Sequence, residues 1–199
     1  MKKLLTTSFS ILCIHTLSVS AQADESQSTL LNMEQKQALV GEAKTNIMSL
    51  AGALTATLKQ GIKADGHAAS VNLCNLQAPA ITKASSAEGG LTEWTVSRTS
   101  LKLRSPANAP DDWVKNIMNN FEQRKANGEN AKNIAHTEVR EGRFFLVKAI
   151  PTKAGCLACH GANVASDVKA KLAELYPNDK ATGFEVGDIR GVFVASKEL

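Results

Sequence analysis

Apolar residues recur at helical spacing over the first part of the chain. Between residues 30 and 64 they return every three or four positions, which predicts a long helix with a kink near Gly41 or Gly52. A second helix is predicted over residues 67–86, with Pro79 bending or interrupting it. One face of this second helix carries Val71, Cys74, Ala78 and Ile81.

Shorter runs of apolar residues follow, separated by turn residues. Strands are predicted over residues 91–97, 135–140, 144–150 and 189–196. The middle two strands are expected to pair as a hairpin through Glu141-Gly142. Helices are predicted from Asp111 to about Ala126, with a buried face of Trp113, Ile117, Met118 and Phe121, and over residues 164–174. Helices first, then strands with inserted helices, predict an α+β fold with an antiparallel sheet.

The first 23 residues resemble a secretory signal peptide. Lys2 and Lys3 begin it, an apolar stretch runs from Leu4 to Val19, and small residues at Ala21 and Ala23 precede Asp24. Polar residues dilute the apolar stretch below what a membrane-spanning helix needs, so cleavage is favoured over anchoring. We therefore expect an exported, periplasmic protein with no membrane span after cleavage, and residues 24–199 as a single domain.

Composition and charge narrow the functional classes. With 43% hydrophobic and 21% charged residues among 199, the chain is globular rather than disordered. Its formal net charge is +4, and cleavage of the signal peptide would remove the two positive charges of Lys2 and Lys3. The remaining charge is too small to indicate nucleic-acid binding.

The cysteines carry the most specific signal. Cys13 leaves with the signal peptide, and an odd number of three remains in an oxidising compartment. Two of these, Cys156 and Cys159, precede His160 in a C-x-x-C-H motif, the attachment motif of c-type haem. Each thiol can add to one vinyl group of the porphyrin, and the adjacent imidazole can then coordinate the iron. The motif predicts one covalently attached haem c.

Three other interpretations of this motif have less support in the sequence. A zinc site would need four ligands, and Cys74, His67 and His136 are single residues far apart in the sequence. A thioredoxin-like pair would begin the helix of a βαβ unit, whereas this pair comes late in the chain. A structural disulfide would leave His160 unexplained.

The residues by themselves leave the second axial ligand open. The candidates are Cys74, His67, His136, Met48 and Met118. Cys74 could equally be a small buried residue on the core face of its helix. Arg98, Lys102 and Arg104 form a cationic segment that could neutralise haem propionates, although a solvated strand face would look the same.

Four segments resemble a known family. They are RTSLKLRSPANAPD at 98–111, CLACHG at 156–161, YPNDKATGF at 176–184 and GDIRG at 187–191. Together they are similar to single-haem c-type cytochromes with a PAS-like fold, over about residues 34–196. Members of that family occur as freestanding exported proteins and as extracytoplasmic sensor domains.

This resemblance implies further properties. The sheet would have about five antiparallel strands flanked by helices. The iron would be held by the histidine of the motif on one side and a cysteine sulfur on the other. That sulfur would belong to Cys74, the remaining mature cysteine outside the motif.

Function is expected to be periplasmic electron transfer or redox sensing, through a redox partner protein. The alternative is a haem-based sensor of a diatomic gas. Since no kinase or transducer segment follows the last predicted strand, such a sensor would need a separate signalling partner. A peroxidase would need an open iron position and a distal acid–base histidine, for which no motif is present, so no enzyme activity is expected.

Overall fold

The computed structural model describes residues 31–86 and 92–199, and Leu31–Leu199 form one compact unit. The predicted signal peptide and the first residue of the predicted strand 91–97 lie outside the described residues. In chain order the elements are α1 (Met33–Ala84), β1 (Thr95–Thr99), a 3-10 turn (Pro106–Asn108), α2 (Asp112–Ala126), β2 (Ala135–Arg140), β3 (Arg143–Pro151), a 3-10 turn (Ala154–Cys156), α3 (Leu157–His160), α4 (Ser166–Leu175) and β4 (Ile189–Glu198).

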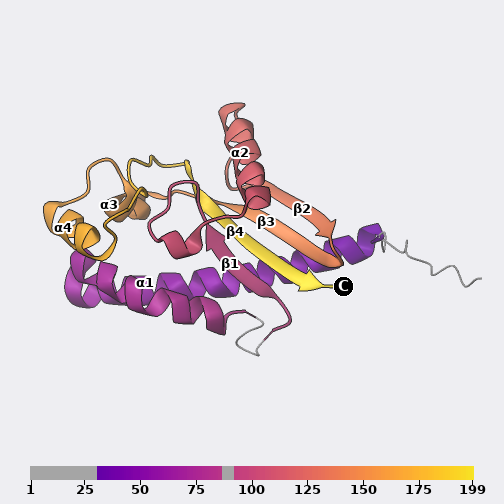
Figure 1. The fold of residues 1–199 in the computed structure, drawn as a ribbon, viewed down its shortest axis with the longest axis horizontal. Coiled ribbons are helices and arrows are strands. Elements are labelled where there is room, and N and C mark those ends of the chain that lie inside the picture. The colour runs from indigo at the N-terminus through magenta and orange to yellow at the C-terminus, as the bar shows by residue number, and fades with distance from the viewer. Residues whose placement is uncertain (1–30, 87–91) are drawn as a thin grey trace, which may run out of the picture. The chain divides into compact units, whose positions relative to one another are not determined.

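All strand pairs are antiparallel, in the order β1-β4-β3-β2 (Figure 1). The predicted α+β, PAS-like class is confirmed, with four strands among the described residues where the family resemblance implied about five. The predicted hairpin joins β2 to β3. Its turn residues Glu141 and Gly142 have φ of 51° and 72°, and positive φ at both central positions gives the right-handed twist that two-residue hairpins require.

Helices cover both faces of the sheet. Phe144 and Leu146 of β3 face α1, in a cluster with Ile47 and Leu50. The alternate residues Val147 and Ala149 belong to a cluster with α2, built on Val114, Ile117, Met118 and Phe121. Because side chains on a strand alternate between faces, burial on both sides accounts for the mainly apolar sequence of β3, whose charged residues are Arg143 and Lys148. The predicted buried face of α2 is confirmed, although Trp113 is only partly buried.

Helix α1 is broken at a different place from the one predicted. The backbone stays helical through Gly41, Gly52 and Pro79, and the non-helical residue is Gly66, with φ of 79°. A positive φ costs glycine little, so the chain can turn there between residues 33–65 and 67–84, called below the first and second arms of α1. No helix among the described residues is long and apolar enough to cross a membrane.

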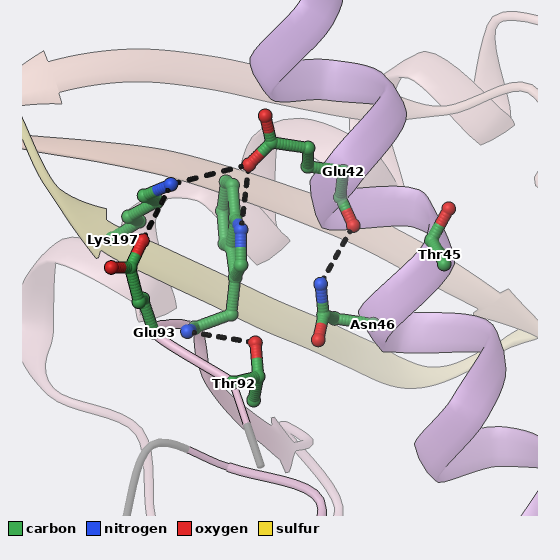
Figure 2. Close-up of a pocket in the computed structure, with 7 residues that line it drawn as sticks. Glu42, Thr45, Asn46, Thr92, Glu93 and Lys197 are labelled. Atoms are coloured by element: carbon green, nitrogen blue, oxygen red, sulfur yellow. Dashed lines mark hydrogen bonds and ion pairs between the residues drawn. The ribbon is translucent and has the colours of Figure 1, made fainter. Parts of the chain in front are cut away.

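A polar network fastens the first arm of α1 to one end of the sheet (Figure 2). The buried Trp94 donates its Nε1–H to Glu42 Oε2 over 3.1 Å. Lys197 Nζ lies 3.3 Å from the same carboxylate oxygen and 2.9 Å from Glu93 Oε2. Trp94 thereby buries its ring against Phe144 while its polar edge keeps a partner.

The second arm packs elsewhere. Val71 forms a small apolar cluster with Val168 and Leu172 of α4 and with Val164, which lies just before that helix. Cys159 and Tyr176 are partly buried against this cluster. The second arm therefore supports the segment that contains the C-x-x-C-H motif.

A close approach of β1 and β4 at Gly191 gives a stability prediction. A Cβ there would overlap the carbonyl oxygen of Thr99, a backbone atom that cannot rotate away. We expect Gly191→Ala to lower the free energy of unfolding by about 1–3 kcal/mol, and each kcal/mol to lower Tm by roughly 2–4 °C. In the control Gly52→Ala the new methyl group meets nothing within 4 Å, so Tm should stay or rise. A Tm of Gly191→Ala equal to that of the wild-type protein in thermal unfolding would contradict the predicted steric overlap.

Candidate functional site

The C-x-x-C-H motif lies on two short helical turns that follow β3. After β3 ends at Pro151, a 3-10 turn contains Cys156 and the single-turn helix α3 ends at His160. Cys156 is the last residue of the 3-10 turn, and Cys159 lies within α3. All three described cysteines are free thiols, and the motif follows a strand of an antiparallel sheet rather than the first strand of a βαβ unit.

The segment 176–184 is tied to the motif by backbone hydrogen bonds. Phe184 N donates to His160 O over 3.0 Å, and Gly183 N donates to Gly161 O over 3.1 Å. Within the segment, Asp179 Oδ1 accepts from Ala181 N over 2.8 Å, which closes a local turn. These bonds bring the carbonyl group of Ala181 to the imidazole of His160.

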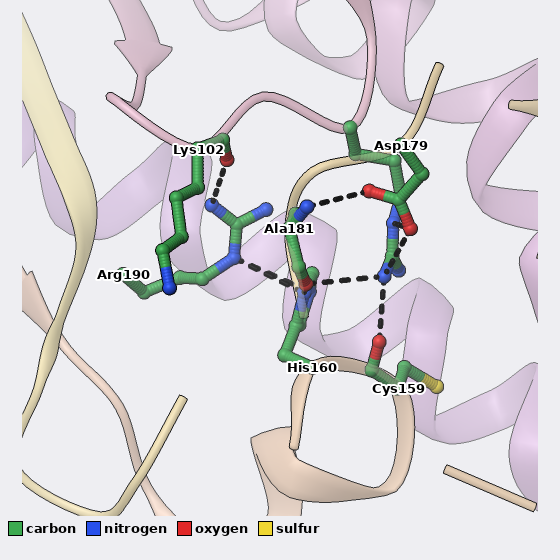
Figure 3. A network of polar contacts seen from close by, with 7 residues as sticks. Lys102, Cys159, His160, Asp179, Ala181 and Arg190 are labelled. Carbon is green, nitrogen blue, oxygen red and sulfur yellow. Dashed lines mark hydrogen bonds and ion pairs between the residues drawn. The ribbon is translucent and has the colours of Figure 1, made fainter. Parts of the chain in front are cut away.

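That carbonyl determines the state of the imidazole. Nδ1 of His160 lies 2.7 Å from Ala181 O, a contact that requires a proton on Nδ1 (Figure 3). Burial, reinforced by the positive charges of Arg190 and Arg104, lowers the pKa of His160 to about 3. The ring is therefore neutral near pH 7, and Nε2 keeps its lone pair.

Arg104 is held beside the motif by several polar contacts. Its guanidinium forms a 3.1 Å ion pair with Asp179, and their side chains are only 15% and 10% exposed. It also donates to the carbonyl oxygen of Cys159. Arg104 thus connects the loop after β1, the segment 176–184 and α3.

Cys74 and Arg98 come from distant parts of the sequence but share this electrostatic environment. Burial raises the pKa of the Cys74 thiol, while the charges of Arg98 and Arg104 oppose that shift. Burial also lowers the pKa of Arg98, opposed by the charge of Cys74. The second arm of α1 and strand β1 therefore bring Cys74 and Arg98 within electrostatic reach of Arg104, which contacts Cys159.

The other candidate axial ligands belong to different surroundings. His67 is exposed next to Gly66, and Met48 is 72% exposed on the first arm. Met118 is 2% exposed in the core under α2. His136 Nε2 lies 3.0 Å from Glu138 Oε2 on β2.

Three residues of the site were missed in the sequence. Asp179 orients Arg104, Phe184 places its ring edge-on to His160 at 6.3 Å between centroids, and Arg190 donates toward the His160 ring. The available signal was a charged residue, Arg190, directly after Ile189 at the start of a strand whose next residues, up to Ala195, are uncharged. For Asp179 and Phe184 only the resemblance pointed to their segment.

Comparisons with known proteins agree with this fold. The profile of the Tll0287-like family matches residues 16–197. The crystal structure of the cyanobacterial haem protein Tll0287 superposes on this structure with a TM-score of 0.58. The two sequences are 24% identical, and the match covers 84% of this chain and 97% of the Tll0287 chain. No curated protein matches the chain significantly. The predicted resemblance is confirmed, and the chain belongs to the Tll0287-like family.

Proposed function

We propose that this protein is an exported c-type haem protein that acts in periplasmic electron transfer or redox sensing. Thioether bonds through Cys156 and Cys159 would hold one haem. His160 and Cys74 would be the axial ligands, as the family resemblance implies. A redox partner protein would supply or accept the electrons.

The observation that carries this proposal is the state of His160. Iron-binding histidines characteristically donate their second ring N–H to a carbonyl or carboxylate, which fixes the tautomer and the ring orientation. His160 has this arrangement, with Nδ1 bonded to Ala181 O and Nε2 left with a lone pair. Its lowered pKa keeps the ring neutral, which is the form that binds a metal.

The remaining residues suit a haem as well. Cys156 and Cys159 are free thiols, so both are available for addition to vinyl groups. Arg98 and Arg104 are partly buried cations that could pair with haem propionates. The similar cyanobacterial structure is itself described as a haem protein, which further supports this cofactor.

The protein would control the redox chemistry through its own side chains. Bound haem iron supplies a one-electron change between its ferric and ferrous states. His160 is oriented by Ala181, and Cys74 lies near the cations Arg98 and Arg104. Axial ligands and nearby charges are the means by which a protein sets a haem potential.

Spectra of the purified exported protein test the proposal. We expect covalent haem in the pyridine haemochrome assay and a low-spin, six-coordinate ferric spectrum. Ferrous and CO-treated spectra should then report whether an external ligand reaches the iron. A protein purified from a host competent in c-type maturation that contains no covalent haem would refute the proposal.

His160→Ala gives a second test. The two thiols remain, so covalent attachment should persist, but the ferric spectrum should become largely high-spin because the axial imidazole is gone. In the control His136→Ala, the lost side chain bonds Glu138 on β2, and the spectrum should not change. An unchanged low-spin spectrum of His160→Ala would mean that another residue binds the iron.

A further inference from the structure

The segment 183–188, just before β4, is hydrogen-bonded to the chain on both sides of the two motif cysteines. At the end of the motif, Phe184 N donates to His160 O over 3.0 Å. Ahead of the motif, Thr152 N donates to Asp188 O over 2.7 Å. The motif is therefore held at its start and at its end by one short segment, which is called the clamp below.

The carboxylate of Asp188 closes the clamp on itself and connects it to α2. Its Oδ2 accepts from Glu185 N over 2.8 Å, and Asp188 N donates to Glu185 O over 3.1 Å. Gly187, with φ of 93°, lies at the third position of this turn, where a positive φ favours glycine. Oδ1 of Asp188 accepts from Lys125 Nζ over 2.7 Å, and Lys125 lies in the last turn of α2. One side chain thus fixes both the shape of the clamp and its place on the sheet's covering helix.

These contacts are partly sheltered from water. The side chains of Lys125 and Asp188 are 34% and 30% exposed, and Thr152 is 2% exposed. A hydrogen bond from a backbone N–H to a carboxylate is stronger than one to a neutral oxygen. Water has little access to replace the backbone bonds of Thr152, so an intact clamp is the favoured arrangement. Removing the Asp188 carboxylate should loosen all of these bonds together.

The clamp also determines what surrounds the imidazole of His160. The ring of Phe184, 6% exposed, lies edge-on to that of His160 with 6.3 Å between centroids. Ala181, two residues before the clamp, provides the carbonyl oxygen that lies 2.7 Å from His160 Nδ1. Movement of the clamp would therefore displace the groups that orient the imidazole.

We propose that Asp188 is a positioning residue for His160: its carboxylate locks the clamp, and the clamp fixes the orientation of the imidazole. This inference rests on the proposed function and deepens it, because residues that orient a metal ligand affect the metal site without touching the metal. It also includes Lys125, and with it the end of α2, in the support of the site.

Two variants test the lock by different routes. Asp188→Ala removes both carboxylate contacts, whereas Lys125→Met removes the ion pair alone. Amide hydrogen exchange at Thr152, Phe184 and Gly187 should accelerate about tenfold in Asp188→Ala and about twofold to fivefold in Lys125→Met. The low-spin ferric EPR signal of both haem-loaded variants should broaden, because the imidazole samples more orientations. Since the two variants change the local charge in opposite senses, a shared response identifies the clamp rather than the charge.

The matched control is Glu185→Gln. Glu185 contributes its backbone N–H to the turn, and its side chain is exposed, so the variant removes a nearby negative charge without removing the bond to Asp188. Its exchange rates and EPR signal should equal those of the wild type.

Unchanged exchange in Asp188→Ala would overturn the inference. Faster exchange with an unchanged EPR signal would overturn it too, because Asp188 would then stabilise the fold without positioning His160. If Asp188→Ala fails to fold, Asp188→Asn, which keeps the shape of the side chain but not its charge, is judged by the same two measurements. Either result in a haem-loaded protein leaves the haem assignment intact, whereas absence of covalent haem from the wild type would refute the proposed function itself.

Discussion

Replacing Cys156 and Cys159 together by serine should release the haem completely. A serine hydroxyl does not form the thioether that a thiol makes with a vinyl group, so no covalent bond to the porphyrin would remain. Acid–acetone should then extract all of the pigment from the variant and none from the wild type. Both cysteines are free thiols on adjacent helical turns, which makes each available for this reaction.

Cys74→Ser is the matched control for this experiment. It removes a cysteine from the same protein but from the second arm of α1, outside the motif, so its haem should stay in the protein fraction after extraction. Pigment that resists extraction from the Cys156/Cys159 double variant would refute attachment through the motif.

The ferric spectrum of Cys74→Ser should lose its sulfur-to-iron charge-transfer absorption, and the midpoint potential should rise. A thiolate is anionic and electron-rich, so it stabilises ferric iron relative to ferrous iron. Burial raises the pKa of Cys74, which keeps the uncoordinated thiol neutral, and the charges of Arg98 and Arg104 favour the thiolate. Binding to iron would supply the remaining stabilisation, because the thiolate rather than the thiol is the metal ligand.

Asn72→Ala is a suitable control for Cys74→Ser. Asn72 is exposed on the same arm of α1, so its loss tests whether altering this helix is sufficient to move the potential. An unchanged spectrum and potential in Cys74→Ser would make Cys74 a core residue. The other candidates, His67, His136, Met48 and Met118, would then need to be tested in turn.

CO binding by the wild-type protein separates an electron carrier from a gas sensor. A neutral thiol is a poor ligand, so protonation of Cys74 after reduction would let CO take its position. A wild-type protein that binds CO only when reduced would support a redox-gated sensor acting through a separate partner. A protein that excludes CO in both redox states would support electron transfer.

The local sequence determined the elements that depend on local chemistry. The hairpin at Glu141-Gly142 was predictable because a two-residue turn needs positive φ, which glycine adopts readily and Gly142 has. Helix α2 was predictable because Asp111 caps its start, accepting from Val114 N over 2.7 Å. The C-x-x-C-H motif was recognisable because its three reactive groups must reach one rigid macrocycle, which fixes their spacing.

Helix α1 shows where local reasoning failed. Gly41 and Gly52 looked like kinks, but a glycine within a helix costs only about 1 kcal/mol, and contacts with the sheet by residues such as Ala43, Ile47 and Leu50 outweigh that cost. The break came at Gly66 instead, where the second arm leaves to pack against α4. The position of the break therefore depends on packing partners that are remote in the sequence.

Within the candidate site, the sequence alone determined the reactive groups of the motif, and the tertiary structure decided what surrounds them. Ala181 and Asp179 act on His160 and Arg104 through hydrogen bonds that span 21 and 75 positions, and no local pattern records such contacts. Arg190 reaches His160 only because β4 pairs between β1 and β3 and begins beside α3. Chemical identity is a property of each residue, whereas orientation, burial and charge balance arise only when distant segments pack together.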